Sequence, residues 1–259
     1  MRIVRFKTKN DSAQYGWVFQ DKVGQIQGDP FGDFRRLEPE FKLVDVELLV
    51  PCLPGKIIAI GKNYPEHAAE MNGEVPQVPM IFLKAPSSLI PSGSPIVLPP
   101  QSAQVEIEGE LAIVIGKQSR WLESAEVKNT VFGYTIANDV TARDLQRSDN
   151  QWARSKSFDT FCPLGPWIET EFEASDAIIT SHINNSLKQM SSTRDMVFDP
   201  LQLVLYISTV MTLNPGDIIL TGTPAGVSQI VDGDTVSVHI DGIGSLINPV
   251  KAEKRFIKE

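Results

Sequence analysis

The sequence contains little of what several protein classes require. Only two cysteines, Cys52 and Cys162, occur in 259 residues, and neither belongs to a C-x-x-C or Cys/His cluster. We therefore expect two reduced thiols rather than a disulfide framework. Basic residues are outnumbered, with 24 Lys and Arg against 32 Asp and Glu and a net charge of −8. Because no basic run is present to neutralise phosphates, nucleic acid is not expected as a partner.

Long apolar segments are also missing. The first residues, MRIVRFKTKND, are charged and lack the apolar stretch of a signal peptide. The longest apolar helical run, LQLVLYISTVMTL at 201–213, has polar interruptions and is too short to span a bilayer. We therefore expect a cytoplasmic protein that does not associate with membranes.

The patterns that are present predict a strand-rich chain with few helices, of the α+β class. Alternating segments at 15–20 and 22–28 predict a hairpin near the N-terminus. The Pro/Gly-rich stretch at 51–56 predicts a boundary. The sequence thus predicts a small β domain over 1–52 and a larger domain over 53–259.

Within the larger domain, strands are expected at 57–61, 105–116 and 131–138. Three segments have helical character. A short helix is expected within 63–73, with Asn63 as its cap; a second helical stretch covers 139–156; and a longer helix over 200–213 starts at Asp199-Pro200.

Three glutamates occupy alternate positions in VEIEGELAIVIGK, residues 105–117. Strand side chains alternate between faces, so one continuous strand would point Glu106, Glu108 and Glu110 the same way. They form either an exposed acidic face or a partly buried cluster. Two buried like charges about 4 Å apart repel by roughly 4 kcal/mol at an effective dielectric constant near 20. Protonation or a bound cation relieves that repulsion, and ligands without Cys or His favour Mg²⁺ or Mn²⁺.

A third carboxylate ligand is available where GYTIAND ends in Asp139, because a strand end there would face a cleft. Asp144 and Asp149 are alternatives, but both fall in the helical stretch and are expected to face solvent. On the short helix, His67 and Glu70 are neighbours at i and i+3. They are either an exposed pair or a general base with a carboxylate that orients it.

The sequence resembles the fumarylacetoacetate hydrolase family across residues 57–249, in seven segments in family order. The segments are IIAIGKNYPEHAAEM, PMIFLKAPSSLIPSGSPIVLPP, VEIEGELAIVIGK, GYTIANDVTARDLQ, KSFDTFCPLGPWI, NPGDIILTGTPAGV and GDTVSVHIDGIGSLINPV. The resemblance implies a mixed β-sandwich roll with a small N-terminal β domain, assembled as a homodimer. It implies that Glu108, Glu110 and Asp139 bind the metal and that Glu106 lies outside the ligand set.

The resemblance also implies roles for other side chains. Lys156 matches the site lysine of the family, and Arg143 and Gln146 match its substrate contacts. In members that cleave carbon–carbon bonds, a His-x-x-Glu pair on a lid helix activates water, which His67 and Glu70 match. Two departures are Ile107, where an aromatic residue is usual, and Ser155, which replaces a common glycine.

Two further segments carry candidate anion contacts. Lys84 in FLKAP is expected to meet an anionic substrate or to be a surface charge. TGTPAGV, residues 221–227, is either an ordinary Gly-Pro turn or a loop whose N–H groups and Thr223 hydroxyl hold a carboxylate. The loops over 74–104 and 184–198 are expected to set specificity, and the lid over 63–73 to be mobile without ligand.

The implied activity is metal-dependent chemistry on a small anionic 2-oxo acid. Hydrolysis of an acylpyruvate or decarboxylation of oxaloacetate, through a metal-stabilised enolate, is the first expectation. An isomerase or tautomerase of oxo-diacids is the alternative, similar to 2-hydroxyhepta-2,4-diene-1,7-dioate isomerase or to an oxaloacetate keto–enol tautomerase. A member that only binds a ligand or partner is the third possibility.

Overall fold

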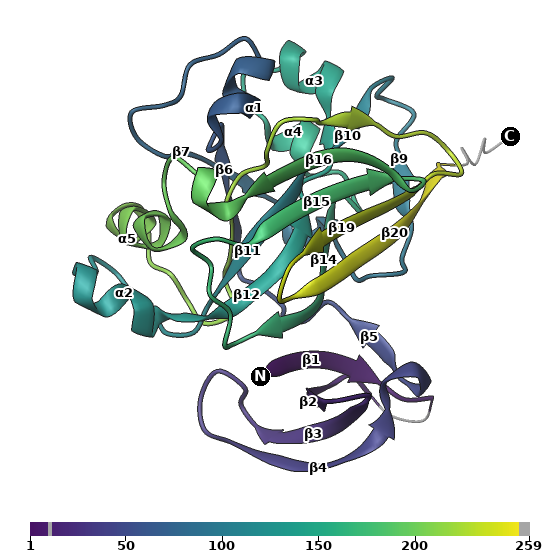
Figure 1. The fold of residues 1–259 in the computed structure, drawn as a ribbon, viewed down its shortest axis with the longest axis vertical. Coiled ribbons are helices and arrows are strands. Elements are labelled where there is room, and N and C mark those ends of the chain that lie inside the picture. Colours follow the sequence, from purple (N-terminus) through teal and green to yellow (C-terminus); the bar gives the residue numbers. More distant parts are fainter. Residues whose placement is uncertain (10–11, 254–259) are drawn as a thin grey trace, which may run out of the picture.

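Strands dominate the computed structural model, which describes residues 1–9 and 12–253 (Figure 1). The strands are β1 (Arg2–Lys7), β2 (Gln14–Phe19), β3 (Lys22–Gly28), β4 (Phe34–Lys42), β5 (Glu47–Leu49), β6 (Ile57–Gly61), β7 (Met80–Lys84), β8 (Leu89–Ile90), β9 (Ile96–Leu98), β10 (Val105–Ile107), β11 (Gly109–Ile115), β12 (Val131–Asn138), β13 (Thr141–Ala142), β14 (Cys162–Glu169), β15 (Ile178–Ile183), β16 (Ser186–Ser192), β17 (Ile218–Leu220), β18 (Ser228–Gln229), β19 (Thr235–Ile240) and β20 (Gly244–Ala252). The helices are α1 (Pro65–Glu70), α2 (Ser124–Thr130), α3 (Arg143–Ser148), α4 (Ala153–Lys156) and α5 (Pro200–Val210). The expected β-rich α+β class is confirmed.

One twelve-stranded sheet runs through the molecule. Its order is β4-β3-β2-β1-β14-β12-β11-β17-β6-β7, with β5 beside β1 and β8 beside β14. The predicted hairpin is present, since β2 pairs with β3 through Val18 and Val23. The first strand also pairs with β14, Ile3 opposite Ile168, so the N-terminal strands continue the sheet of the larger part. The division at residue 52 therefore stays a prediction.

A five-stranded sheet, β16-β15-β19-β20-β9, packs across the large sheet and encloses the main core (Figure 1). Ile113 on β11 and Ile136 on β12 lie in one buried cluster with Ile179 on β15 and Val238 on β19. Strand side chains alternate, so the other face of β11 and β12 presents Ala112 and Ala137 to a second cluster. The two sheets form the expected sandwich, with a short sheet β13-β10-β18 beside it.

The prediction of one continuous strand over 105–116 is wrong. The chain leaves the three-stranded sheet after Ile107 and enters the large sheet at Gly109, so Glu108 stands between two sheets. Side-chain amide oxygens accept hydrogen bonds from the backbone N–H groups at this break. Asn138 Oδ1 accepts from the Glu108 N–H at 2.9 Å, and Gln189 Oε1 accepts from the Gly109 N–H at 2.9 Å.

The strand break also explains why residue 109 is a glycine. A Cβ at Gly109 would lie 2.2 Å from Ser181 Oγ and 2.9 Å from a methyl group of Val238. Strands β15 and β19 therefore pass too close for any side chain at this position. This close approach seats the five-stranded sheet directly against the start of β11.

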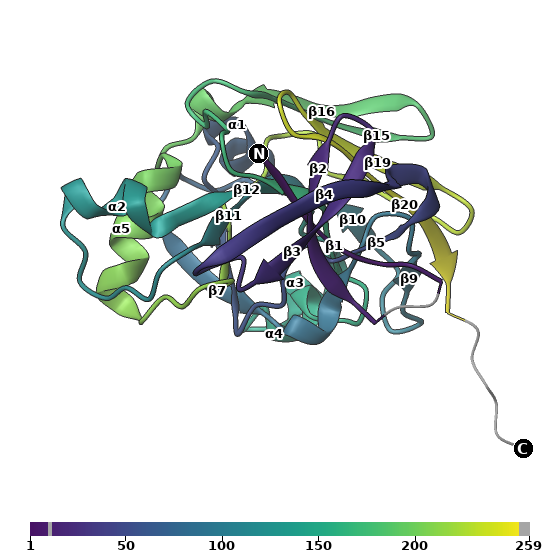
Figure 2. The ribbon, with the colours of Figure 1, turned by 90° about the horizontal axis from the view of Figure 1, so that it is seen from below.

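The helices agree with the sequence only in part. Asp199 caps α5 as expected, accepting from the N–H groups of Leu201 and Gln202, but α5 ends at Val210 rather than at 213. The stretch at 139–156 forms two short helices, α3 and α4, instead of one. Helices α2 and α5 contact each other at the side of the molecule away from β20 (Figure 2). No helix within the described residues is long and apolar enough to cross a membrane.

The predicted cap of α1 is wrong. Its N-cap residue is Tyr64, without a side-chain cap hydrogen bond. Asn63 instead ties three segments together: its Nδ2 donates to the carbonyls of Thr221 (2.7 Å) and Phe198 (3.0 Å), and its Oδ1 accepts from the Phe198 N–H. The entry to α1 is therefore anchored to the core.

Candidate active site

A cavity of about 200 Å³ lies where α1, α3 and α4 meet the ends of β6 and β11. Its apolar side includes Phe82 and Trp152, whose rings meet edge to face at 5.2 Å. The full lining is Ile60, Gly61, Lys62, His67, Met71, Phe82, Glu108, Glu110, Arg143, Gln146, Arg147, Trp152, Lys156 and Thr223. Most of the side chains that the sequence nominates thus face one space.

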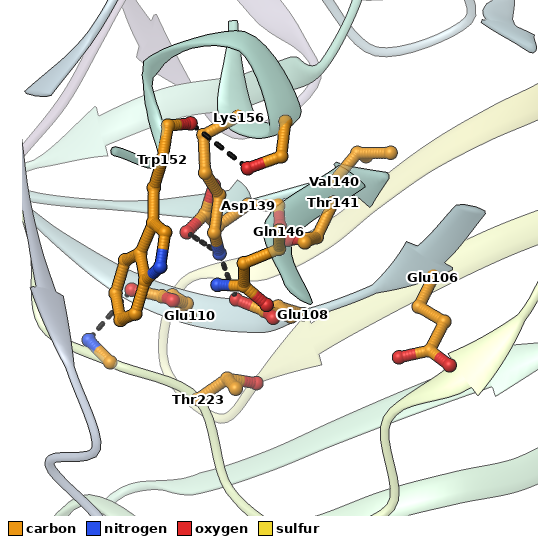
Figure 3. Close-up of polar contacts among 12 residues, drawn as sticks. Glu106, Glu108, Glu110, Asp139, Val140, Thr141, Gln146, Trp152, Lys156 and Thr223 are labelled. Carbon is orange, nitrogen blue, oxygen red and sulfur yellow. Dashed lines mark hydrogen bonds and ion pairs between the residues drawn. The ribbon is translucent and has the colours of Figure 1, made fainter. Parts of the chain in front are cut away.

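Strand pairing brings three carboxylates together beside this cavity, and two of them, Glu108 and Glu110, line it. Gly109 lies opposite Asn138 in the antiparallel pair β11–β12, so the residue after β12 meets the residue before β11. The Asp139 N–H donates to the Glu108 carbonyl at 2.8 Å. One carboxylate oxygen each from Glu108, Glu110 and Asp139 lies within 4.8 Å of the others, and all three residues are buried (Figure 3).

Three other acidic residues lie outside this group. Glu106 points away from it in Figure 3, because the chain changes sheets at Glu108; the expectation that all three glutamates share a face is wrong for Glu106. Asp144 accepts from the Ser102 hydroxyl and the Ala103 N–H, and Asp149 pairs with Arg154. Neither Asp144 nor Asp149 reaches the cavity lining.

Two buried lysines hold Asp139 from different sides. Lys156 Nζ donates to Asp139 Oδ2 at 2.6 Å and to Glu108 Oε2 at 2.7 Å (Figure 3). Lys84 Nζ donates to Asp139 Oδ1 at 2.5 Å and to the carbonyls of Lys156 and Val140. Lys156 lines the cavity, but Lys84 does not. The structure therefore shows Lys84 bound to Asp139, and the contact of Lys84 with an anionic substrate stays a prediction.

Arg143 connects the strand break to α3. Its Nε donates to Glu106 Oε2 at 2.7 Å, one terminal nitrogen to Glu108 Oε1 at 2.5 Å, and the other to Gln146 Oε1 at 2.5 Å. The side chain is 2% exposed. Arg143 and Gln146 thus face the cavity together, as the i and i+3 spacing on one helix requires.

The buried charges do not balance. Four carboxylates (Glu106, Glu108, Glu110, Asp139) and three cations (Lys84, Arg143, Lys156) sum to −4 + 3 = −1. Among these four carboxylates Glu110 alone has no cation partner; its Oε2 accepts from the Gly222 N–H at 2.6 Å. Burial, together with the charges of Asp139 and Glu108, raises the pKa of Glu110 well above its usual value.

The pKa of Glu108 is shifted in the opposite direction. Burial by itself would raise its pKa, but Lys156 and Arg143 outweigh burial and hold the pKa of Glu108 below its usual value. The negative charge that lacks compensation is therefore at Glu110. A proton or a divalent cation neutralises it, and three clustered carboxylates with no Cys or His ligand fit Mg²⁺ or Mn²⁺.

His67 and Glu70 form the expected pair on α1. His67 Nδ1 lies 3.0 Å from Glu70 Oε2, and the imidazole is 8% exposed and lines the cavity. The other Glu70 oxygen accepts from the Gly226 N–H at 3.0 Å. The pair therefore also joins α1 to the loop at 221–227.

The loop at 221–227 binds a carboxylate of the protein itself, that of Glu110. The Gly222 N–H donates to Glu110, so it is not available to a substrate. The Thr223 hydroxyl donates to the Gly109 carbonyl at 2.9 Å and accepts from Gln189 Nε2 at 2.8 Å, although Thr223 still lines the cavity. Gln189 thereby ties β16 to both the strand break and the loop.

Several residues of the site were not nominated from the sequence. Lys62 directly follows a buried strand, and this position was a usable signal. Asn138 and Gln189 carry no local signal, because their partners lie 30 and 80 residues away along the chain. The Ser155 hydroxyl, at the position of a common family glycine, donates to the Trp152 carbonyl at 3.0 Å and supports the turn that presents Lys156.

Comparison with known proteins shows which family the chain resembles. The model "Fumarylacetoacetate (FAA) hydrolase C-terminal" matches residues 56–251, and "Rv2993c-like, N-terminal" matches residues 1–51. Protein Rv2993c of Mycobacterium tuberculosis is 48% identical over 229 residues, covering 87% of this chain and 86% of its own. The mitochondrial oxaloacetate tautomerase fahd2 of Xenopus laevis is 43% identical over 219 residues, covering 80% of this chain and 69% of its own.

Solved structures are similar along almost the whole chain. The 2-hydroxyhepta-2,4-diene-1,7-dioate isomerase of Mycobacterium marinum superimposes with a TM-score of 0.91 at 42% identity, covering 98% of this chain and 100% of its own. Maleylpyruvate hydrolase of Sphingobium sp. SYK-6, in complex with manganese(II) and pyruvate, gives 0.80 at 32% identity with the same coverage. The chain belongs to the fumarylacetoacetate hydrolase family.

Proposed function

We propose that this protein is a divalent-metal-dependent enzyme that acts on small anionic 2-oxo acids, hydrolysing the carbon–carbon bond of an acylpyruvate or decarboxylating oxaloacetate. The observation that carries the proposal is the meeting of two groups at one cavity. Glu108, Glu110 and Asp139 form a clustered oxygen donor set, and His67, held by Glu70, faces the same space. The first group suits a hard cation and the second suits proton transfer.

The metal would be held by Glu108, Glu110 and Asp139, whose burial excludes competing water. When bound there, Mg²⁺ or Mn²⁺ supplies positive charge that polarises a carbonyl oxygen of the substrate. Lys84 and Lys156 keep Asp139 in place from both sides. The manganese named with the Sphingobium hydrolase supports this assignment without choosing between the two ions.

The charge of the site suits an anionic ligand only when a cation is present. The buried groups sum to −1, so a divalent ion brings the total to −1 + 2 = +1. A single carboxylate then restores neutrality. Arg143 and Gln146 on α3 line the cavity and would contact that carboxylate, whereas the Thr223 hydroxyl donates to the Gly109 carbonyl and would need to turn before it could. The pyruvate named with the Sphingobium hydrolase is a ligand of this class.

His67 would move the proton. In the tautomer that donates Nδ1–H to Glu70, Nε2 is free to accept a proton from water or from the carbon next to the 2-oxo group. For hydrolysis, His67 takes the proton of the attacking water, and the carbon–carbon bond breaks as the departing carbon keeps the electron pair. Decarboxylation needs no water, so both reactions can use the same residues.

A tautomerase or isomerase is the second candidate. It needs the same charge stabilisation and the same proton carrier, without bond cleavage. The names of the Xenopus tautomerase and the Mycobacterium marinum isomerase, at 43% and 42% identity, favour it. The geometry at His67 serves either outcome.

The test is a panel of 2-oxo acids, assayed with and without Mg²⁺ or Mn²⁺ for both cleavage and enol absorbance. Metal-dependent cleavage of an acylpyruvate or of oxaloacetate supports the leading proposal. Metal-dependent enol–keto interconversion without cleavage across the panel replaces it with the tautomerase. Absence of both reactions, with metal-loaded protein, refutes the proposed function.

A further inference from the structure

A second cavity, here called the Tyr134 cavity, lies at the start of β12. Its volume is about 470 Å³, and small-molecule sites have about 300–1,000 Å³. Its lining comes from β12, α2, the loop after β14 and the start of α5 (Figure 1). It shares no lining residue with the candidate active site. Tyr134 precedes Asp139 by five residues, about 16 Å at the rise of a strand. The proposed chemistry therefore does not use the Tyr134 cavity.

The Tyr134 hydroxyl is a polar group without a partner. Tyr134 is 8% exposed and lines the cavity, yet within residues 1–9 and 12–253 its hydroxyl makes no hydrogen bond. A buried tyrosine hydroxyl usually has a partner, because leaving it unpaired costs free energy. The ring of Tyr134 contacts that of Phe172, with centroids 5.4 Å apart, so both rings are held at the cavity. The hydroxyl is therefore placed to hydrogen-bond a molecule that enters.

Carboxylates without a counter-charge make the Tyr134 cavity negative. Glu173 and Asp199 line it, and neither forms an ion pair in the described part of the chain. Burial, and then the charges of these two carboxylates, raise the pKa of Tyr134 to about 12. The lining also contains two cations. Arg194 is already paired with a carboxylate outside the cavity, and Lys128 is unpaired among the described residues. The unpaired groups therefore sum to −2 + 1 = −1, which a monovalent cation neutralises.

Aromatic rings supply the other part of a site for an organic cation. Phe132, Tyr134 and Phe172 line the cavity, and the face of such a ring attracts an ammonium group. The two carboxylates attract the same group and repel an anion. We propose that the Tyr134 cavity binds a small organic cation, an ammonium compound with an apolar body and a hydrogen-bonding group for the tyrosine hydroxyl. This inference does not rest on the proposed function.

Two probes of equal shape isolate the charge of the ligand. Choline and 3,3-dimethylbutan-1-ol share a hydroxyl and a branched apolar end, and differ in a positively charged nitrogen against a neutral carbon. Their binding to protein in excess Mg²⁺ is measured by calorimetry, so the readout does not depend on turnover. We expect wild-type protein to bind choline at least about tenfold more tightly, which corresponds to about 1.4 kcal/mol and lies within the range of a cation–π contact.

Three variants place the probes in the cavity. Glu173→Gln removes a carboxylate at an exposed position and should weaken choline by about threefold, with the alcohol unchanged. Tyr134→Phe keeps the ring and removes the unpaired hydroxyl, so it should weaken both probes by the same factor. Glu171→Gln is the matched control, because it makes the same change as Glu173→Gln two residues earlier and outside the lining. It should leave both affinities as in wild type.

Several outcomes would overturn the inference. Wild-type protein that does not bind choline, or that binds the alcohol equally well, contradicts a cation site. A Glu173→Gln variant with wild-type affinity for choline, or a Glu171→Gln variant that loses as much, contradicts binding in the Tyr134 cavity. So does a Tyr134→Phe variant that binds both probes as tightly as wild type. None of these results bears on the proposed function, because the two cavities are separate.

Discussion

The substitution Glu110→Gln separates the metal site from the fold most cleanly. The amide keeps the shape of the side chain and an oxygen that can accept from the Gly222 N–H. It removes the one charge of the buried group that no lysine or arginine compensates. Two like charges 4.8 Å apart, the upper separation within the cluster, repel by about 3 kcal/mol at an effective dielectric constant near 20. The metal-free variant should therefore be at least as stable as metal-free wild type.

The same substitution should remove stabilisation by metal. An ion that binds only the folded state at about 100 times its Kd stabilises that state by about 2.7 kcal/mol. For a chain of this size, about 1 kcal/mol shifts Tm by roughly 2–4 °C, so wild type should gain roughly 5–11 °C with saturating Mg²⁺ or Mn²⁺. Glu110→Gln should gain almost nothing. Thermal denaturation with chelator and with metal measures both quantities.

Glu106→Gln is the matched control, because it makes the same chemical change four residues earlier. Its carboxylate contacts Arg143 and Gln104 and lies outside the cluster, so the metal-induced gain in Tm should persist. A full gain in Glu110→Gln, or a loss of the gain in Glu106→Gln, would show that the ligands have been misassigned.

The other predictions concern the proton carrier, the strand break and the lid. His67→Ala should lower turnover by about 10²–10⁴-fold and leave the metal-induced gain in Tm intact. Glu70→Gln should lower turnover by a smaller factor, because Glu70 only orients the imidazole. Unchanged turnover in His67→Ala would remove His67 from the mechanism. Gln189→Leu leaves the buried Gly109 N–H unpaired, so it should lower the free energy of unfolding by about 1–3 kcal/mol and weaken metal binding. Denaturant titration and calorimetry measure the two effects. Unchanged stability and metal affinity would show that other contacts maintain the strand break. Hydrogen exchange within 63–73 should slow when oxalate is added to Mg²⁺-loaded protein, and strong protection of the whole segment in the free protein would contradict a mobile lid.

Local patterns accounted for much of the fold. The alternation in β2 and β3, the cap at Asp199 and the apolar run of β11 each depend on residues close together in the chain. The sequence also allowed Asp139 to be predicted as a partner of Glu108, because a carboxylate at a strand end is well placed to face a cleft. The roles expected for His67 and Lys156 came from the family resemblance, since spacing by itself left each open to a surface role.

The remaining features depend on contacts between distant segments. Alternation predicted one strand through Glu108, but the side chains of Asn138 and Gln189 satisfy the backbone there and let the chain change sheets. Asn63 had a good local position for a cap, yet its amide is used by Thr221 and Phe198. Lys84 was interpreted as a substrate contact because the sequence around it does not show that its ammonium group binds the distant Asp139.

Proton exchange at the carbon next to the 2-oxo group tests the central claim most directly. All the candidate reactions require Glu108, Glu110 and Asp139 to hold a cation while charge develops on the 2-oxo oxygen, whether or not a bond then breaks. Pyruvate in D₂O is followed by proton NMR with wild-type protein, with Mg²⁺ or with chelator. We predict that exchange of the methyl protons is accelerated by protein with Mg²⁺, and is lost with chelator and in Glu110→Gln. Exchange that continues unchanged under chelation, or no exchange with metal-loaded wild type, would contradict the account.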